Sequence, residues 1–327
     1  MTVETERRPT ASILRSLIRE VCKLADPAIE VHGLSKRYGD HAALDQVDFS
    51  VRRGEIFGLL GPNGAGKTTT LECLEGLRLP DAGRLRVMGI DPTRERHKLR
   101  QVMGVQLQTG SLPAYFTIRE MIRLFSAYHE VNPDWAVTER LGLGNLLNTQ
   151  YQALSTGQKR RLSLALATLH QPAVLLLDEP TAGLDVGARI ALHELMRELR
   201  AQGTTILLST HDMAEAETMA DRVAILLQGR IVAVGTPREL TATGAGLTKV
   251  TVRTINNSLR AFTHPQIRQS QQQDEYAVFY TTEPGPVVTA IMHHIQTEAD
   301  ELVDLRVERP SLEERFLELT RTAASDV

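Results

Sequence analysis

A glycine-rich segment at residues 61–68 constrains the fold of this chain more than any other feature. It lies between an apolar run at residues 56–60 and a run of helix-forming residues that follows Lys67. The apolar run predicts a buried strand and the later run a helix, so the segment is a strand-to-helix turn. Glycines let backbone amides approach a ligand closely, and the start of a helix attracts anions. The sequence therefore predicts a site for the phosphates of ATP or GTP.

Two side chains of this segment have specific expected roles. Lys67 is expected to bridge the outer two phosphates, and the Thr68 hydroxyl to bind Mg²⁺, a cation that prefers oxygen ligands. A glycine turn without a ligand is the alternative, and the strand before and the helix after disfavour it. The residues assigned to phosphate binding are Gly61, Pro62, Asn63, Gly64, Ala65, Gly66, Lys67, Thr68 and Thr69.

A second glycine-bearing turn leads into a helix-forming run at residues 159–167. Ser155 is placed to cap this helix, so its start is a second candidate anion site. One triphosphate does not need two such helix ends from a single domain, which favours an oligomer. The turn consists of Leu154, Ser155, Thr156, Gly157 and Gln158.

Two adjacent carboxylates follow a continuous apolar run at residues 173–177. Such a run is typical of a strand covered on both faces, and ligands bind at the ends of such strands. We expect Asp178 to hold Mg²⁺ through water and Glu179 to polarise an attacking water. A solvated acidic turn is the alternative.

With these motifs in this order, residues 29–237 resemble the ATP-binding cassette (ABC) family, specifically the nucleotide-binding subunit of a transporter. The resemblance implies an α/β fold: a P-loop NTPase cassette with a RecA-like core, an antiparallel β subdomain and a helical subdomain. It also implies ATP and Mg²⁺ as cofactors, and ATP hydrolysis as the activity. ATP binding would close a dimer, and hydrolysis would reopen it.

Further site residues follow from the resemblance alone. Tyr38 matches the aromatic residue that stacks on adenine, and Gln108 matches the glutamine that touches Mg²⁺ or the attacking water. Gln106 is close enough to Gln108 for the alignment to slip by two residues. Asp185 matches the turn that crosses to the partner subunit, and His211 matches the histidine that contacts the γ-phosphate. Taken alone, a tyrosine or histidine at these positions is more often structural.

The signature turn departs from the family pattern, which has two glycines after the serine. Thr156 adds a Cβ and a hydroxyl near the expected phosphate of the opposing subunit, and we expect it to be tolerated because Gly157 is present. The chain has one cassette and no internal repeat. A homodimer with two sandwiched ATP molecules is the simplest assembly, and a heterodimer with a related ATPase is the alternative.

Composition limits the possible partners. With 37 basic and 40 acidic residues the net charge is −3, so no nucleic-acid partner is expected. Only Cys22 and Cys73 are present, which favours a reducing compartment. No apolar run reaches the about 18 residues of a membrane span, and no secretory signal opens the chain. The resemblance to a transporter subunit then implies a location at the cytoplasmic face of the cell membrane, bound to a separately encoded permease.

The sequence divides into four regions. Residues 1–27 are an extension, either disordered or an amphipathic helix. Residues 28–237 form the cassette, with the helical subdomain at about residues 109–170. Residues 238–327 are expected to form a small α+β accessory domain, in which residues 269–273 are assigned to a polar loop.

The end of this last domain, at residues 310–319, resembles the drug-export branch related to daunorubicin and doxorubicin resistance subunits. The expected function is therefore to energise an exporter of drugs or other hydrophobic compounds. A soluble ABC ATPase acting on ribosomes or nucleic acid, or the ATPase of an importer, remains open as the alternative.

Overall fold

The computed structural model describes residues 27–106, 112–242, 247–308 and 311–325. The chain divides into two compact units, the first ending at Val234 and the second beginning at Gly235. The boundary expected from the sequence lies three residues later, after residue 237, which is the first residue of helix α9 (Pro237–Ala242). Residues 1–26, which make up almost all of the predicted extension, lie outside the described residues.

A six-stranded sheet forms the centre of the first unit, in the order β5-β6-β7-β3-β8-β9. Neighbouring strands from β5 to β8 in this order are parallel. Every residue of β3, β6 and β7 is buried, which explains the apolar runs at Ile56–Leu60, Val174–Leu177 and Ile206–Leu208. The strands are β3 (Ile56–Leu60), β5 (Met103–Gln106), β6 (Val174–Asp178), β7 (Thr205–Thr210), β8 (Arg222–Leu227) and β9 (Arg230–Gly235).

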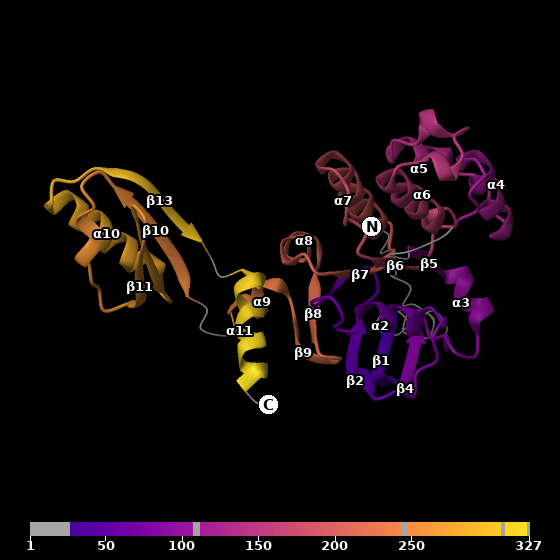
Figure 1. The fold of residues 1–327 in the computed structure, drawn as a ribbon, viewed down its shortest axis with the longest axis horizontal. Coiled ribbons are helices and arrows are strands. Elements are labelled where there is room, and N and C mark those ends of the chain that lie inside the picture. Colours follow the sequence, from indigo (N-terminus) through magenta and orange to yellow (C-terminus); the bar gives the residue numbers. More distant parts are fainter. Residues whose placement is uncertain (1–26, 107–111, 243–246, 309–310, 326–327) are drawn as a thin grey trace, which may run out of the picture. The chain divides into compact units, whose positions relative to one another are not determined.

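A three-stranded antiparallel sheet and helix α2 (Lys67–Leu74) lie on one side of the central sheet (Figure 1). The apolar residues between them form one continuous core. Within it the rings of Phe49 and Phe57 stack with their centroids 5.5 Å apart, a contact worth about 0.5–1.5 kcal/mol beyond burial. The strands, in spatial order, are β2 (His41–Val51), β1 (Ile29–Tyr38) and β4 (Ala82–Val87).

The helical subdomain lies on the opposite side of the central sheet (Figure 1). Two of its helices begin with capping boxes, Thr117 with Glu120 and Ser155 with Gln158, and Ser155 is the cap that the sequence predicts. Its helices are α4 (Ile118–Tyr128), α5 (Trp135–Arg140) and α6 (Thr156–Thr168), with 3-10 turns η1 (Gly144–Leu146) and η2 (Tyr151–Ala153). The other helices of the unit are α3 (Arg96–Val102), α7 (Val186–Ala201) and α8 (Met213–Met219).

Strand register brings the sequence motifs to one edge of the central sheet. Leu60, which precedes the glycine-rich turn, pairs with Thr210, and Asp178 pairs with Ser209. Because these strands are parallel, their carboxyl ends lie side by side, where ligands bind in open α/β sheets. The turn, the acidic pair and His211 therefore meet at this edge.

The second unit contains an antiparallel sheet in the order β11-β12-β10-β13, and helix α10 (Pro284–Thr297) packs on one face through a small apolar core. The element order matches a split β-α-β arrangement in which the 3-10 turn η3 (Ser258–Ala261) replaces the first helix. Helix α11 (Leu312–Ser325) packs against α9. The strands are β10 (Thr248–Thr254), β11 (Ile267–Gln273), β12 (Tyr276–Thr281) and β13 (Leu302–Glu308).

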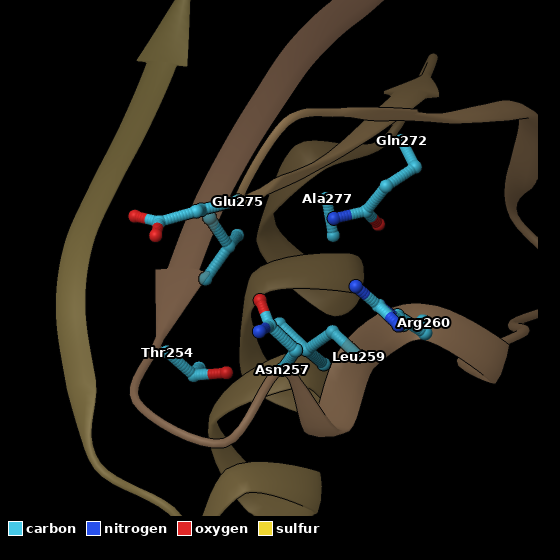
Figure 2. A pocket seen from close by; sticks show the side chains of 8 residues that line it. Thr254, Asn257, Leu259, Arg260, Gln272, Glu275 and Ala277 are labelled. Carbon is cyan, nitrogen blue, oxygen red and sulfur yellow. The ribbon is translucent and has the colours of Figure 1, made fainter.

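The expectation of a polar loop at residues 269–273 is wrong, because this segment belongs to edge strand β11. Its backbone pairs with β12 along the whole strand, and no residue of β11 is fully buried. An edge strand with polar side chains lacks the apolar alternation by which strands are predicted. In Figure 2, Gln272 of β11 and Arg260 of η3 extend into the space between their elements. Side chains fill this space and leave no volume for a water molecule.

Within the described part of the chain, no helix has both the length and the apolar character needed to cross a membrane.

Candidate nucleotide site

Two glycines of the phosphate loop are required by the fold of this chain itself. A Cβ on Gly61 would lie 2.3 Å from the Leu226 carbonyl oxygen of β8. Gly66 has φ +107°, and a Cβ there would lie 2.6 Å from the Ala43 carbonyl oxygen of β2. The loop is thus pressed against β8 and β2, which fixes its shape.

Gly66 is the N-cap residue of helix α2 and has no side chain to cap it. Its first amides are therefore available to phosphate oxygens, and the helix dipole favours an anion at this position. The Lys67 ammonium is buried and donates to the carbonyl oxygens of Gly61 (2.8 Å) and Pro62 (3.2 Å). Burial lowers the pKa of Lys67, while the nearby carboxylates of Glu179 and Asp178 oppose this shift. These donors fit a triphosphate group.

Asp178, the last residue of β6, accepts hydrogen bonds from two hydroxyls. Thr68 Oγ1 donates to one carboxylate oxygen over 3.0 Å, and Ser209 Oγ donates to the other. The structure thus brings together Thr68 and Asp178, two of the side chains predicted to hold Mg²⁺. Both present the oxygen ligands that Mg²⁺ prefers.

Glu179 has an unusual backbone conformation, with φ +47° in the left-handed region. Non-glycine residues there are uncommon and cluster at functional sites, where surrounding contacts hold them. The Glu179 amide donates to the Ser209 carbonyl over 3.0 Å, and Arg160 of α6 donates to the Glu179 carbonyl over 3.0 Å. These contacts hold a buried carboxyl group, 8% exposed, at the edge of the sheet.

The Glu179 side chain connects Lys67 with His211. Its Oε1 lies 3.6 Å from Lys67 Nζ and 3.1 Å from His211 Nδ1. His211 is half exposed, so its ring reaches from Glu179 toward solvent. At these distances the carboxylate or the imidazole can accept a proton from water, and the ammonium group can stabilise a nearby negative charge.

A pocket of about 400 Å³ adjoins these groups, within the size range of ligand sites. It joins Tyr38, predicted to stack on adenine, to the phosphate loop and Glu179. Tyr38 is partly exposed, and the Arg78 guanidinium carbon lies 5.3 Å from its ring centroid. The lining residues are Tyr38, His41, Ala43, Asn63, Gly64, Gly66, Lys67, Thr68, Thr69 and Glu179.

The signature turn does not line this pocket. The Ser155 hydroxyl accepts from the Gln158 amide, and the Gln158 side chain accepts from the Ser155 amide, so both residues cap α6. Leu154 is buried and Thr156 is exposed. Asp185 caps α7 by accepting from the Ala188 amide over 2.8 Å. Their predicted contacts with a second subunit stay predictions.

Gln108 lies outside the described residues, so its role at Mg²⁺ or the attacking water stays a prediction. Gln106, the neighbour with which it could be confused, ends strand β5 and is only 3% exposed. The Gln106 Oε1 atom accepts no hydrogen bond from the residues that the structure describes.

Sequence reasoning missed two residues that hold the acidic pair, Ser209 and Arg160. Ser209 could have been found, because it lies one residue before the end of β7, the strand adjacent to that of Asp178, and two residues before His211. Arg160 gave no signal, since arginines on a helix are common and its target is a backbone carbonyl.

Comparison with known proteins is consistent with this geometry. The family profile described as ABC transporter matches residues 44–182. The Nod factor export ATP-binding protein I of Ralstonia nicotianae is 40% identical over 306 residues, covering 90% of this chain and 94% of the relative.

The chain belongs to the ABC transporter family.

Other members of the family are similar over comparable lengths. The daunorubicin resistance ATP-binding protein DrrA3 of Streptomyces coeruleorubidus is 36% identical over 309 residues, covering 91% of this chain and 97% of the relative. A solved structure titled as the ATP binding subunit of an ABC transporter superposes with a TM-score of 0.63 at 33% identity. It covers 65% of this chain and 92% of that one.

These findings confirm the predicted cassette fold and the resemblance to daunorubicin resistance subunits. As an ABC ATP-binding subunit, the chain binds ATP and couples its hydrolysis to transport.

Proposed function

We propose that this chain energises a membrane exporter of drugs or other hydrophobic compounds from the cytoplasmic face of the membrane. Two similar proteins are named for Nod factor export and for daunorubicin resistance, which favours export over import. The observation that carries the hydrolytic role is the Glu179–His211 contact of 3.1 Å beside Lys67. The net charge of −3 offers little attraction to nucleic acid.

The residues would share the work of phosphoryl transfer to water. Glu179 would polarise the attacking water, and His211 would orient it toward the γ-phosphate. Lys67 would offset charge that develops on the phosphate oxygens. Thr68, Asp178 and Gln108 would hold Mg²⁺, which would supply further positive charge at those oxygens.

A dimer that closes on ATP is supported by Gly157 in the first turn of α6. Glycine costs about 1 kcal/mol relative to alanine inside a helix. A Cβ at Gly157 would meet only Leu184 Cδ2, at an ordinary 3.7 Å, and the residue has no positive φ. The described part of this chain therefore gives no steric reason for glycine, whereas close approach by a second subunit's nucleotide would.

A docking surface for the permease is supported by exposed apolar residues of the helical subdomain. Leu124 and Tyr128 lie one turn apart on α4, and Tyr115 and Phe116 shortly precede that helix. Exposed apolar side chains of this kind form interaction sites when they are contiguous on the surface. Gln108 is close in sequence to this surface, so it would report nucleotide state to the permease.

Transport by inverted membrane vesicles tests the proposal. Vesicles from cells with the intact chain should take up daunorubicin or a Nod factor when given Mg-ATP, and vesicles carrying Glu179→Gln should not. ATP-driven uptake only in right-side-out vesicles would instead indicate an importer. Sedimentation of the chain with ribosomes, and its absence from membranes, would overturn the proposal in favour of a soluble ATPase.

A further inference from the structure

The chain on both sides of His211 is held by helix α8. Thr210 Oγ1 donates to Glu215 Oε2 over 2.8 Å and accepts from the Asp212 amide over 3.0 Å. Asp212 in turn caps α8 by accepting from the Glu215 amide over 3.0 Å. The residues before and after His211 therefore have little freedom, and Glu215 takes part on both sides.

The second oxygen of the Glu215 carboxylate contacts helix α7. His193 Nε2 lies 3.3 Å from Glu215 Oε1, and the side chains are 14% and 1% exposed respectively. A carboxylate buried to this extent is costly unless its oxygens receive hydrogen bonds. Thr210 and His193 provide one each, so removing either leaves a buried oxygen without its partner.

Helix α7 thus reaches the His211 segment at two points. Besides His193, Arg189 of α7 lies 3.9 Å from an Asp212 carboxylate oxygen. The same helix begins at its N-cap residue Asp185. A rigid helix therefore links the turn expected to meet a second subunit with the segment that carries His211.

We propose that His193 is a positioning residue for ATP hydrolysis, acting through Glu215 and Thr210 to fix His211 relative to Glu179. The inference rests on the proposed role of His211 at the hydrolytic site. Since the His211–Glu179 contact is a single interaction of 3.1 Å, a small displacement of the His211 segment breaks it. Misplacing a catalytic group by about 1 Å can cost on the order of a hundredfold in rate.

Two substitutions at residue 193 separate positioning from packing. His193→Leu keeps much of the volume and removes the donor, whereas His193→Gln places an amide donor near the position of Nε2. We expect His193→Leu to lower kcat by roughly ten- to a hundredfold with KM for ATP within about twofold. His193→Gln should recover most of the loss. Glu194→Leu, an exposed position on the same helix, is the matched control and should leave kcat unchanged.

A readout independent of turnover is the imidazole resonance of His211 in protein labelled with ¹⁵N-histidine. The resonance is assigned by its loss in His211→Gln. We expect it to shift in His193→Leu and to return toward the wild-type position in His193→Gln. Should His193→Leu fail to fold, Thr210→Val removes the hydroxyl at the other end of the network with almost no change in volume. It should produce the same kcat loss and the same shift, and the double variant should be non-additive.

The proposal is overturned if His193→Leu retains wild-type kcat, or if kcat falls while the His211 resonance stays unmoved. It is also overturned if Glu194→Leu reduces kcat as much as His193→Leu does. Failure of the proposed function is a different result, because vesicles that carry the wild-type protein would then show no ATP-driven uptake. In that case the His211 resonance still reports whether His193 positions the segment.

Discussion

Thr68 Oγ1 donates a 3.0 Å hydrogen bond to Asp178 Oδ2, joining the first turn of α2 to the end of β6. Two side chains that lie far apart in the sequence, and that were assigned to one metal site, are thus in direct contact. The other Asp178 oxygen accepts from Ser209 Oγ, so both carboxylate oxygens are oriented. A site held in this way needs little rearrangement when its ligand binds.

Glu179→Gln should bind ATP normally but hydrolyse it at least about a hundredfold more slowly, because the amide cannot accept the proton from water. The closed dimer should then persist in Mg-ATP. Calorimetry, steady-state ATPase measurements and light scattering report the three properties. A variant that stays monomeric in Mg-ATP would contradict the closing scheme.

Lys67→Ala should weaken ATP binding by about tenfold or more, equivalent to about 1.4 kcal/mol, since the ammonium lies beside the expected outer phosphates. Calorimetry with ATP measures the change. Lys98→Ala, which removes an exposed ammonium on α3, is the control and should leave affinity unchanged. Equal effects of the two variants would argue for general electrostatic attraction instead.

Thr156→Gly restores two consecutive glycines in the signature turn, and we expect it to raise steady-state ATPase activity by less than about tenfold. The reason is that Thr156 is exposed at the start of α6, where its side chain can turn away from an opposing phosphate. A larger increase would show that the threonine holds back closure. Melting temperature should be followed as well, because glycine is a weaker helix former than threonine.

Glu75 gives the chain a pH dependence of stability that can be isolated. Burial, and to a lesser extent the charges of Asp178 and Glu72, raise its pKa from 4.5 to about 8. Between these values the native state binds a proton that the unfolded state has released. This contribution is therefore fully present below pH 4.5 and is lost as pH rises toward 8.

Glu75→Gln does not titrate. From pH 4.5 to pH 8 its free energy of unfolding should therefore rise relative to that of the wild type by on the order of 5 kcal/mol. Urea unfolding at a series of pH values measures the difference. Glu194→Gln, at an exposed position, serves as the control and should show no such trend. A difference between Glu75→Gln and wild type that does not change with pH would refute the assignment.

The main features of the site could be predicted because local sequence specifies them. A glycine-rich turn between a strand and a helix, and carboxylates at the end of an apolar strand, identify their chemistry without knowledge of the partners. The sequence explains only part of the need for glycine at residue 61. The atom that leaves no room for a Cβ there is the carbonyl oxygen of Leu226, on a strand far along the chain. Local pattern cannot reveal which distant strand lies alongside.

Other features depended on tertiary pairing and were missed for that reason. Strand β11 is stabilised by backbone hydrogen bonds to β12, and its glutamines carry no apolar periodicity. The contact between Arg160 and the Glu179 carbonyl depends on how α6 packs on the sheet. The role of Gln108 was predicted from the family resemblance, and this residue lies outside the described residues.

The backbone conformation of Glu179 also limits which amino acids can occupy that position. At φ +47°, β-branched side chains such as valine and isoleucine are strongly disfavoured, while glycine, asparagine and aspartate are the best tolerated. Of the tolerated residues only aspartate also carries a carboxylate, and it is one methylene shorter. Conformation and chemistry together therefore leave almost no alternative amino acids at this position. Substitutions there should be rare during evolution, even where other positions of the cassette vary.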